Sequence, residues 1–107
     1  MKIKIQYQYF ESCPNHIKML VNLFEAVKGI ENYIEFEKVI IEDEETAKKL
    51  KFLGSPALLI NGKDLLGALP PENISLFCRF YPNGIPSSEE IRKKIIEIIN
   101  FQAASCI

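Results

Sequence analysis

Residues 2–41 change their periodicity twice, and this pattern constrains the fold more than any other feature of the chain. Residues 2–9 alternate polar and apolar side chains, as a strand does, and the apolar face holds Ile3, Ile5, Tyr7 and Tyr9. Residues 14–28 place their apolar side chains at helical spacing, at Ile17, Leu20, Val21, Phe24 and Val27. Residues 33–41 are rich in β-branched side chains and predict a second strand. This order predicts a parallel pair of strands joined by a right-handed crossover.

The second half of the chain predicts two more helices around a short apolar strand. Asp43 is expected to cap a helix that runs to Leu53 and ends at Gly54, with acidic residues in its first turn and lysines near its end. Ser87 and Glu90 have the spacing of a capping box ahead of a last helix over residues 88–101. The predicted fold class is therefore α/β, in the order βαβ-α-ββ-α, with a mixed central sheet flanked by helices.

The partner of the apolar strand at residues 57–60 can be predicted in two ways. Asn61 and Gly62 form a turn signal directly after it, so residues 63–66 are able to pair back as a tight hairpin. If residues 61–71 form a longer loop instead, residues 76–81 are the strand that pairs with residues 57–60. We favour the longer loop, because residues 76–81 otherwise have no role in the sheet.

Length and charge restrict the number of domains and the kinds of partner. The 107 residues suffice for one domain, residues 1–107, in which residues 102–107 are expected to form a flexible tail. With 13 basic and 14 acidic residues, the chain has no net field that would recruit nucleic acid or an anionic membrane. The sequence has neither an apolar run of membrane-spanning length nor a secretory signal. We therefore expect a cytoplasmic protein that binds neither nucleic acid nor membrane, and its oligomeric state stays open.

Cys13 lies at the junction between the first strand and the first helix, directly before Pro14. A thiol at a helix N-terminus faces free backbone N–H groups and the positive end of the helix dipole, and both favour the thiolate. Cys13 is thus a candidate catalytic nucleophile. A dithiol site would have its second cysteine three residues later, but this chain has His16 there, so the local sequence is monothiol. A protonated His16 near the Cys13 sulfur would favour the thiolate further, and a solvent-exposed His16 without a role is an equal alternative.

The other two cysteines, Cys78 and Cys106, are the candidates for a resolving thiol within the chain. An odd number of widely spaced cysteines does not indicate a structural disulfide framework. We predict that Cys78 is a buried core residue, because its expected position in a strand would place it beyond disulfide reach of Cys13. Cys106 falls in the predicted tail, where a catalytic role is not expected.

Metal and acid-base chemistry have weaker support in the sequence. Cys13 and His16 supply a thiolate and an imidazole, but zinc sites use three or four protein ligands and no second paired motif is present. We therefore predict no cofactor and no zinc site. Capture of a soft metal ion by Cys13 with Cys78 or Cys106 is a weaker alternative. The acidic run at residues 42–45 is interpreted as helix capping.

Three motifs occur in this order along the chain: Tyr9-Phe10-Glu11-Ser12-Cys13-Pro14, Gly54-Ser55-Pro56 and Cys78-Arg79-Phe80-Tyr81. Together with the order of elements, they make the chain resemble the thioredoxin-like superfamily over nearly its whole length, and in particular its small bacterial and archaeal members. The resemblance implies a thioredoxin-like fold with a cis proline at Pro56 beside the active-site thiol. It also implies that Pro14, Ser55 and Pro56 contact the substrate. The chain departs from thioredoxin itself at His16, where the second cysteine is missing.

Two functions from different classes follow from these residues. The first is a monothiol thiol-disulfide oxidoreductase, in which Cys13 attacks a protein disulfide or a glutathione adduct while the backbone beside Pro56 pairs with the substrate. Glutathione, another cysteine or another protein would then have to resolve the mixed disulfide. The second is a non-catalytic binding module on the same scaffold, for a peptide, a partner protein or a soft metal ion. The sequence leaves the physiological substrate and the reductant open.

Overall fold

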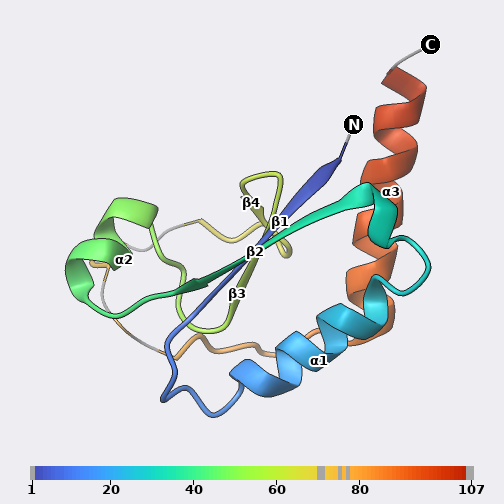
Figure 1. The fold of residues 1–107 in the computed structure, drawn as a ribbon. Coiled ribbons are helices and arrows are strands. Elements are labelled where there is room, and N and C mark those ends of the chain that lie inside the picture. The colour runs from blue at the N-terminus through green and yellow to red at the C-terminus, as the bar shows by residue number, and fades with distance from the viewer. Residues whose placement is uncertain (1, 70–71, 75, 77, 106–107) are drawn as a thin grey trace.

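The computed structural model describes residues 2–69, 72–74, 76 and 78–105 (Figure 1). These residues form a succession of strands and helices: β1 (Ile3–Tyr9), α1 (His16–Ala26), β2 (Ile34–Ile40), α2 (Glu44–Leu50), β3 (Ala57–Ile60), β4 (Lys63–Asp64) and α3 (Ser88–Ser105). A 3-10 helix at Glu31–Tyr33 precedes β2. Within the described part of the chain, no helix combines the length and the apolar character needed to cross a membrane.

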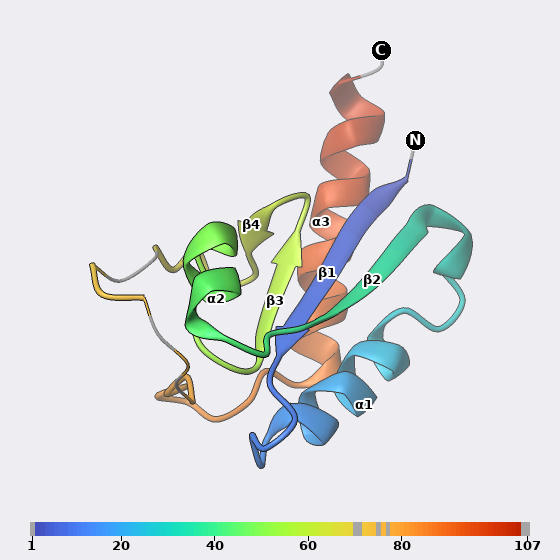
Figure 2. The same ribbon diagram turned by 60° about the vertical axis from the view of Figure 1, so that its left-hand side comes forward.

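The strands form one mixed sheet in the order β2-β1-β3-β4. β1 pairs with β2 in parallel, with Ile3 opposite Ile34, and pairs with β3 antiparallel, with Tyr7 opposite Leu58. The α/β class, the mixed sheet and the parallel β1-β2 pair are therefore confirmed. This topology brings the carboxyl ends of β1 and β2 and the start of β3 to the same end of the sheet. Figure 2 shows these three ends together at the lower end of the sheet.

The partner of β3 is the hairpin strand β4, so our preference for residues 76–81 was wrong. Asn61 and Gly62 both have positive φ, 52° and 83°, as the two central residues of a tight hairpin turn require. Glycine reaches this conformation without strain. Among the described residues of 76–81, pairing is limited to one parallel bridge between Ser55 and Cys78. Residue 77 lies outside the described residues.

Hydrophobic side chains fill both faces of the sheet, and the helices divide between them. α1 and α3 cover one face, and α2 covers the other (Figure 1). The larger cluster joins β1, β3, α1 and α3 through buried residues that include Ile5, Tyr7, Met19, Leu58, Ile91 and Ile95. The smaller cluster packs Ala47 and Phe52 against Ile41 and Ala57 on the α2 side. Because β1 is covered on both sides, the loop that follows it is anchored to a rigid strand.

The helix boundaries differ from the sequence prediction where local bonds intervene. α1 begins at His16 with Asn15 as its N-cap, so Pro14 precedes the helix rather than opening it. Asp43 caps α2 as predicted, since its carboxylate accepts from the Thr46 N–H at 2.7 Å. α2 ends at Leu50 instead of Leu53, because Lys51 adopts a left-handed conformation with φ of 55° and stops the helix.

The last helix is longer than predicted. The Ser87 hydroxyl accepts from the Glu90 N–H at 3.1 Å and caps α3, as the sequence indicates. The helix then continues to Ser105, so four residues of the expected tail are helical. Cys106 lies outside the described residues.

Candidate active site

Cys13 lies in the turn between β1 and α1, before the first residue of the helix. Its backbone N–H donates to the Phe10 carbonyl at 3.1 Å, which closes this turn. The residue is only 2% exposed. Its Sγ donates to the backbone carbonyl of Ser55 at 3.3 Å. The thiol predicted as the nucleophile is thus held against the segment that enters β3 and is covered from solvent.

Ser55 connects three segments of the site. Its hydroxyl accepts from the Phe10 N–H at 3.2 Å. Its carbonyl accepts from the Cys13 thiol at 3.3 Å and from the Arg79 N–H at 2.9 Å. The bond from Ser55 to Pro56 is cis, as the resemblance implies. Because buried polar groups are costly when unpaired, these bonds fix the relative positions of the three segments.

The three residues predicted to contact substrate differ in their exposure. Pro14 is exposed beside Cys13. Ser55 and Pro56 have fully buried side chains. In this conformation Ser55 and Pro56 therefore position the thiol and offer no side-chain surface to a substrate.

Cys78 is neither buried nor out of reach of Cys13, so our prediction for it was wrong. It is exposed, and its Sγ donates to the Cys13 Sγ at 3.9 Å. The prediction failed because it assumed a strand in which Cys78 lies several residues from the sheet edge. Instead Cys78 forms an isolated bridge with Ser55, the residue whose carbonyl accepts from Cys13. The structure thus brings together two thiols that we had predicted to lie beyond disulfide reach of each other.

The environment of Cys78 favours its protonated form. Loss of solvent around the sulfur raises the pKa of Cys78 first, and the hydrogen bond to Cys13 and the negative charge of an ionised Cys13 raise this pKa further. Together these contributions keep the proton on Cys78. In a thiol pair, the sulfur that ionises first is the one that attacks as a thiolate.

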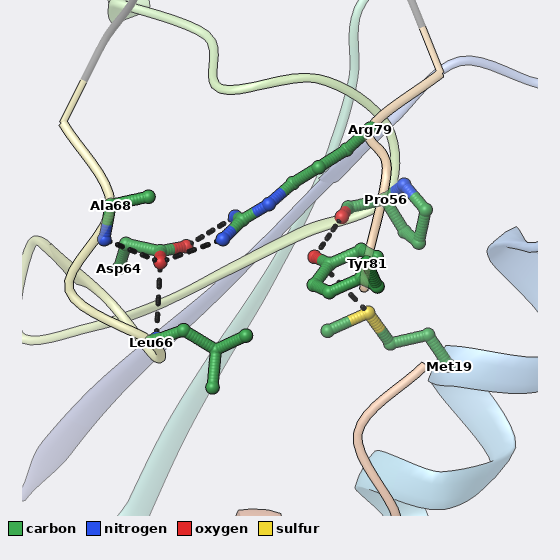
Figure 3. Close-up of polar contacts among 7 residues, drawn as sticks. All are labelled: Met19, Pro56, Asp64, Leu66, Ala68, Arg79 and Tyr81. Carbon is green, nitrogen blue, oxygen red and sulfur yellow. Dashed lines mark hydrogen bonds and ion pairs between the residues drawn. The ribbon is translucent and has the colours of Figure 1, made fainter. Parts of the chain in front are cut away.

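An ion pair holds the segment that carries Cys78 against the β3-β4 hairpin (Figure 3). The Arg79 guanidinium donates to both carboxylate oxygens of Asp64, at 2.5 and 3.0 Å. The same carboxylate accepts from the backbone N–H groups of Leu66 and Ala68, each at 3.0 Å. The Arg79 and Asp64 side chains are 10% and 1% exposed. Because the pair is bidentate and buried, it fixes the relative positions of Arg79 and Asp64 more strictly than a surface salt bridge would.

The charge of Asp64 depends on these donors. Burial by itself would raise the pKa of Asp64. The hydrogen bonds from Arg79, Ala68 and Leu66, together with the positive charge of Arg79, outweigh the burial and lower this pKa below the usual aspartate value. Asp64 therefore remains a carboxylate through the neutral pH range.

Tyr81 links the same segment to Pro56. Its hydroxyl donates to the Pro56 carbonyl at 2.5 Å, and the Arg79 guanidinium lies 4.6 Å from the centre of its ring (Figure 3). Burial raises the pKa of Tyr81 to about 12, so its hydroxyl keeps the proton that it donates. The segment that follows Cys78 is thus bonded to Ser55 and Pro56, and the β1-α1 turn that carries Cys13 is bonded to Ser55.

His16 packs against Tyr9. Its ring stacks on the Tyr9 ring with 4.7 Å between the ring centres. Its Nδ1 is buried and has no hydrogen-bond partner among the described residues. Its backbone carbonyl accepts from the Tyr7 hydroxyl. The ring is half-buried, so His16 is not the solvent-exposed residue of the second alternative, and a role for its charge near the Cys13 thiol stays a prediction.

Asp64 was not predicted to be part of the site, and Arg79 and Tyr81 were predicted only as members of the third motif. The Asn61-Gly62 turn was the available signal, since a hairpin there places Asp64 beside β3. Cys106, the other candidate resolving thiol, lies outside the described residues. Among the residues that the structure describes, no three His, Cys, Asp or Glu side chains come together as metal ligands.

Comparison with known proteins supplies a likeness of fold. No protein-family model matches the chain, and no curated protein matches it in sequence. A solved structure described as that of a malarial protein is similar, with a TM-score of 0.59 and 14% sequence identity. The similarity covers 91% of this chain and 97% of the other. At this identity the likeness shows a shared fold and carries no information about activity.

Proposed function

We propose that the protein is a thiol-disulfide oxidoreductase with a thioredoxin-like fold, in which Cys13 and Cys78 form the exchanging pair. The observation that carries the proposal is the 3.9 Å contact between the two sulfur atoms beside the cis bond at Pro56. The order βαβ-α-ββ-α and the three motifs support the fold assignment. The site is monothiol in its local sequence, but the fold supplies a second thiol from a distant segment.

The proposed reaction has two exchange steps. The Cys13 thiolate attacks one sulfur of a substrate disulfide, the substrate S–S bond breaks, and one substrate thiolate leaves. Cys78 then loses its proton and attacks the Cys13 Sγ, which releases the second substrate thiolate and leaves a Cys13–Cys78 disulfide. The substrate gains two electrons and two protons, and the protein is oxidised by the same amount. A low-molecular-weight thiol or a protein dithiol must reduce this disulfide before the next cycle.

The raised pKa of Cys78 suits this order of events. Before substrate binds, the raised pKa keeps Cys78 protonated, which disfavours Cys78 as the attacking thiolate. Once Cys13 is bonded to substrate it has no negative charge. This removes one cause of the raised pKa and makes Cys78 easier to ionise at the step where it must attack.

Single-cysteine variants test the proposal directly. The Cys106→Ser variant serves as the parent, and Cys13→Ser and Cys78→Ser are added to it separately. We measure the reduction of hydroxyethyl disulfide with a thiol reductant, and we identify trapped species by mass spectrometry. We expect Cys13→Ser to abolish exchange, and Cys78→Ser to accumulate a mixed disulfide on Cys13. Retention of the parent rate in Cys13→Ser would overturn the proposal, and an inactive parent would favour the binding-module alternative.

A further inference from the structure

A groove is lined in part by the segments that lead into the two cysteines. Its walls are residues 10–12 of the β1-α1 turn, residues 40–42 at the end of β2, and Leu76, and its volume is about 610 Å³. Ser12 directly precedes Cys13, and Leu76 comes shortly before Cys78. Two of the three walls are therefore continuous with the segments that carry the sulfur atoms. A substrate chain whose disulfide reaches the pair has this groove next to it.

The third wall is placed there by the sheet topology. β1 and β2 are parallel with Tyr9 opposite Ile40, so their carboxyl ends lie side by side (Figure 2). Ile41 continues this pairing, since its N–H donates to the Tyr9 carbonyl at 2.7 Å. The groove is thus built on the two strands at the centre and edge of the sheet, and its position relative to Cys13 is fixed by backbone hydrogen bonds.

The groove combines an apolar surface with negative charge. Phe10, Ile40 and Leu76 supply most of the apolar surface, because Ile41 also lines the groove but is almost fully buried. Glu11 and Glu42 are the charged residues. Among the described residues, neither glutamate side chain makes a hydrogen bond or an ion pair. None of the residues that line the groove is a lysine or an arginine.

The surroundings strengthen this charge. The chain continues from Glu42 into Asp43, Glu44 and Glu45, at the start of α2, whereas the lysines of this helix lie in its last turn. Lys38, on β2, is positioned over the ring of Tyr9, 5.8 Å from its centre. Two unpaired carboxylates beside an apolar surface attract cationic groups and repel anionic ones, and the effect is largest at low ionic strength.

We propose that the site takes protein or peptide disulfides in which basic and apolar residues flank the reactive cysteine. Apolar side chains occupy the Phe10–Leu76 surface, and a lysine or arginine pairs with Glu11 or Glu42. Glutathione adducts are poor substrates, because glutathione carries more carboxylates than amines and has no large apolar side chain. This inference rests on the proposed oxidoreductase function and names the substrate class of the same site.

The test compares two synthetic peptides with the Cys106→Ser protein. Both peptides have the same length and leucines near a cysteine that is linked to 2-thiopyridine through a disulfide. One peptide has lysines around the cysteine, and the other has glutamates at the same positions. Release of 2-thiopyridine reports the second-order rate constant. At low ionic strength we expect the lysine peptide to react about tenfold faster than the glutamate peptide, with a smaller ratio in high salt.

Charge-reversal variants locate the effect. The double variant Glu11→Lys/Glu42→Lys is expected to invert the preference between the two peptides. The control Glu25→Lys/Glu97→Lys changes the net charge equally at exposed positions on α1 and α3, outside the groove, and is expected to keep the parent preference. An inverted preference in the control would show that the net charge of the protein sets the selectivity. It would overturn the proposal that the groove selects the substrate.

The outcomes separate the two proposals. Equal rates for the lysine and glutamate peptides, with exchange still dependent on Cys13, would overturn the substrate class and leave the oxidoreductase function intact. No exchange above the uncatalysed rate with either peptide would overturn the oxidoreductase function itself.

Discussion

The Sγ atoms of Cys13 and Cys78 lie 3.9 Å apart, although 65 positions separate the two cysteines in sequence. Bond formation requires the sulfur atoms to approach to about 2.05 Å, which a modest change in side-chain torsion achieves when the backbones are already adjacent. The Ser55-Cys78 bridge and the bond from Cys13 to the Ser55 carbonyl supply that adjacency.

Mild oxidation of the Cys106→Ser protein is therefore expected to give an intramolecular Cys13–Cys78 disulfide. Mass spectrometry should find the protein lighter by two hydrogens, and digestion without reduction should yield one peptide pair that contains both cysteines. The Cys78→Ser control should keep a free Cys13 or form a bond to another molecule. Two free thiols after oxidation of the parent would contradict the geometry.

The raised pKa of Cys78 predicts how its alkylation depends on pH. In the Cys106→Ser protein, the midpoint for Cys78 should lie above the ordinary thiol value of about 8.5. Cys13→Ala removes the hydrogen bond and the charge of Cys13 but leaves most of the partial loss of solvent around the Cys78 sulfur, so the midpoint should fall part of the way. Iodoacetamide labelling followed by peptide mapping measures Cys78 separately. An unchanged midpoint would show that Cys13 does not influence Cys78.

The Asp64-Arg79 pair should contribute strongly to stability. Arg79→Met leaves a buried carboxylate with only two backbone donors, so we expect a loss of about 3–5 kcal/mol in the free energy of unfolding. Arg79→Lys keeps the charge but not the bidentate geometry and should give an intermediate loss. Urea titration provides the values. Equal stability of Arg79→Met and the parent would show that the pair contributes nothing.

The lowered pKa of Asp64 also predicts a dependence of stability on pH. A carboxyl whose pKa is lower in the folded state stabilises the protein at pH values above its unfolded pKa of about 3.9, and this contribution disappears as the pH falls through the folded pKa. Urea titrations between neutral pH and about pH 3 should therefore show a steeper loss of stability in the parent than in Arg79→Met. Parallel curves for the two proteins would assign the acid sensitivity to other carboxylates.

Removal of the Tyr81 hydroxyl should destabilise the site. Tyr81→Phe leaves the Pro56 carbonyl without the donor that it has at 2.5 Å, which predicts a loss of about 1–2 kcal/mol in the free energy of unfolding. Tyr33→Phe is the matched control, since Tyr33 is 52% exposed and should tolerate the change. The two variants are compared by urea titration, and similar losses would argue against a specific role for the Tyr81 hydroxyl.

Local sequence patterns predicted β1, α1 and β2 because these elements have long and distinct periodicities. The cap at Asp43 and the capping box at Ser87 were also predictable, since each depends on residues a few positions apart. The β3-β4 hairpin was a harder choice. Its turn signal at Asn61-Gly62 was present, but the β-like composition of residues 76–81 competed with it, and composition does not reveal whether a segment finds a partner.

The site itself depends on contacts that no local pattern contains. Asp64 and Arg79 are 15 positions apart, and their pairing follows from the hairpin together with the path of the chain past Ser55. The contact between Cys13 and Cys78 follows from the same path. Because this path is not visible in the sequence, we assumed a regular strand and predicted that Cys78 lies in the core. Cys13 was predictable as a candidate nucleophile from its place before the first helix, whereas the residues that bring a second sulfur to it were not.

The different exposure of the two sulfur atoms has a consequence for damage by oxidants. Cys78 is exposed and Cys13 is covered, so a peroxide that arrives from solvent meets Cys78 first. A sulfenic acid formed there has a thiol 3.9 Å away with which to condense. Condensation to a disulfide is reversible by thiols, whereas further oxidation to sulfinic or sulfonic acid is largely permanent. The arrangement thus gives an oxidised Cys78 a reversible end point, the disulfide with Cys13, before irreversible oxidation.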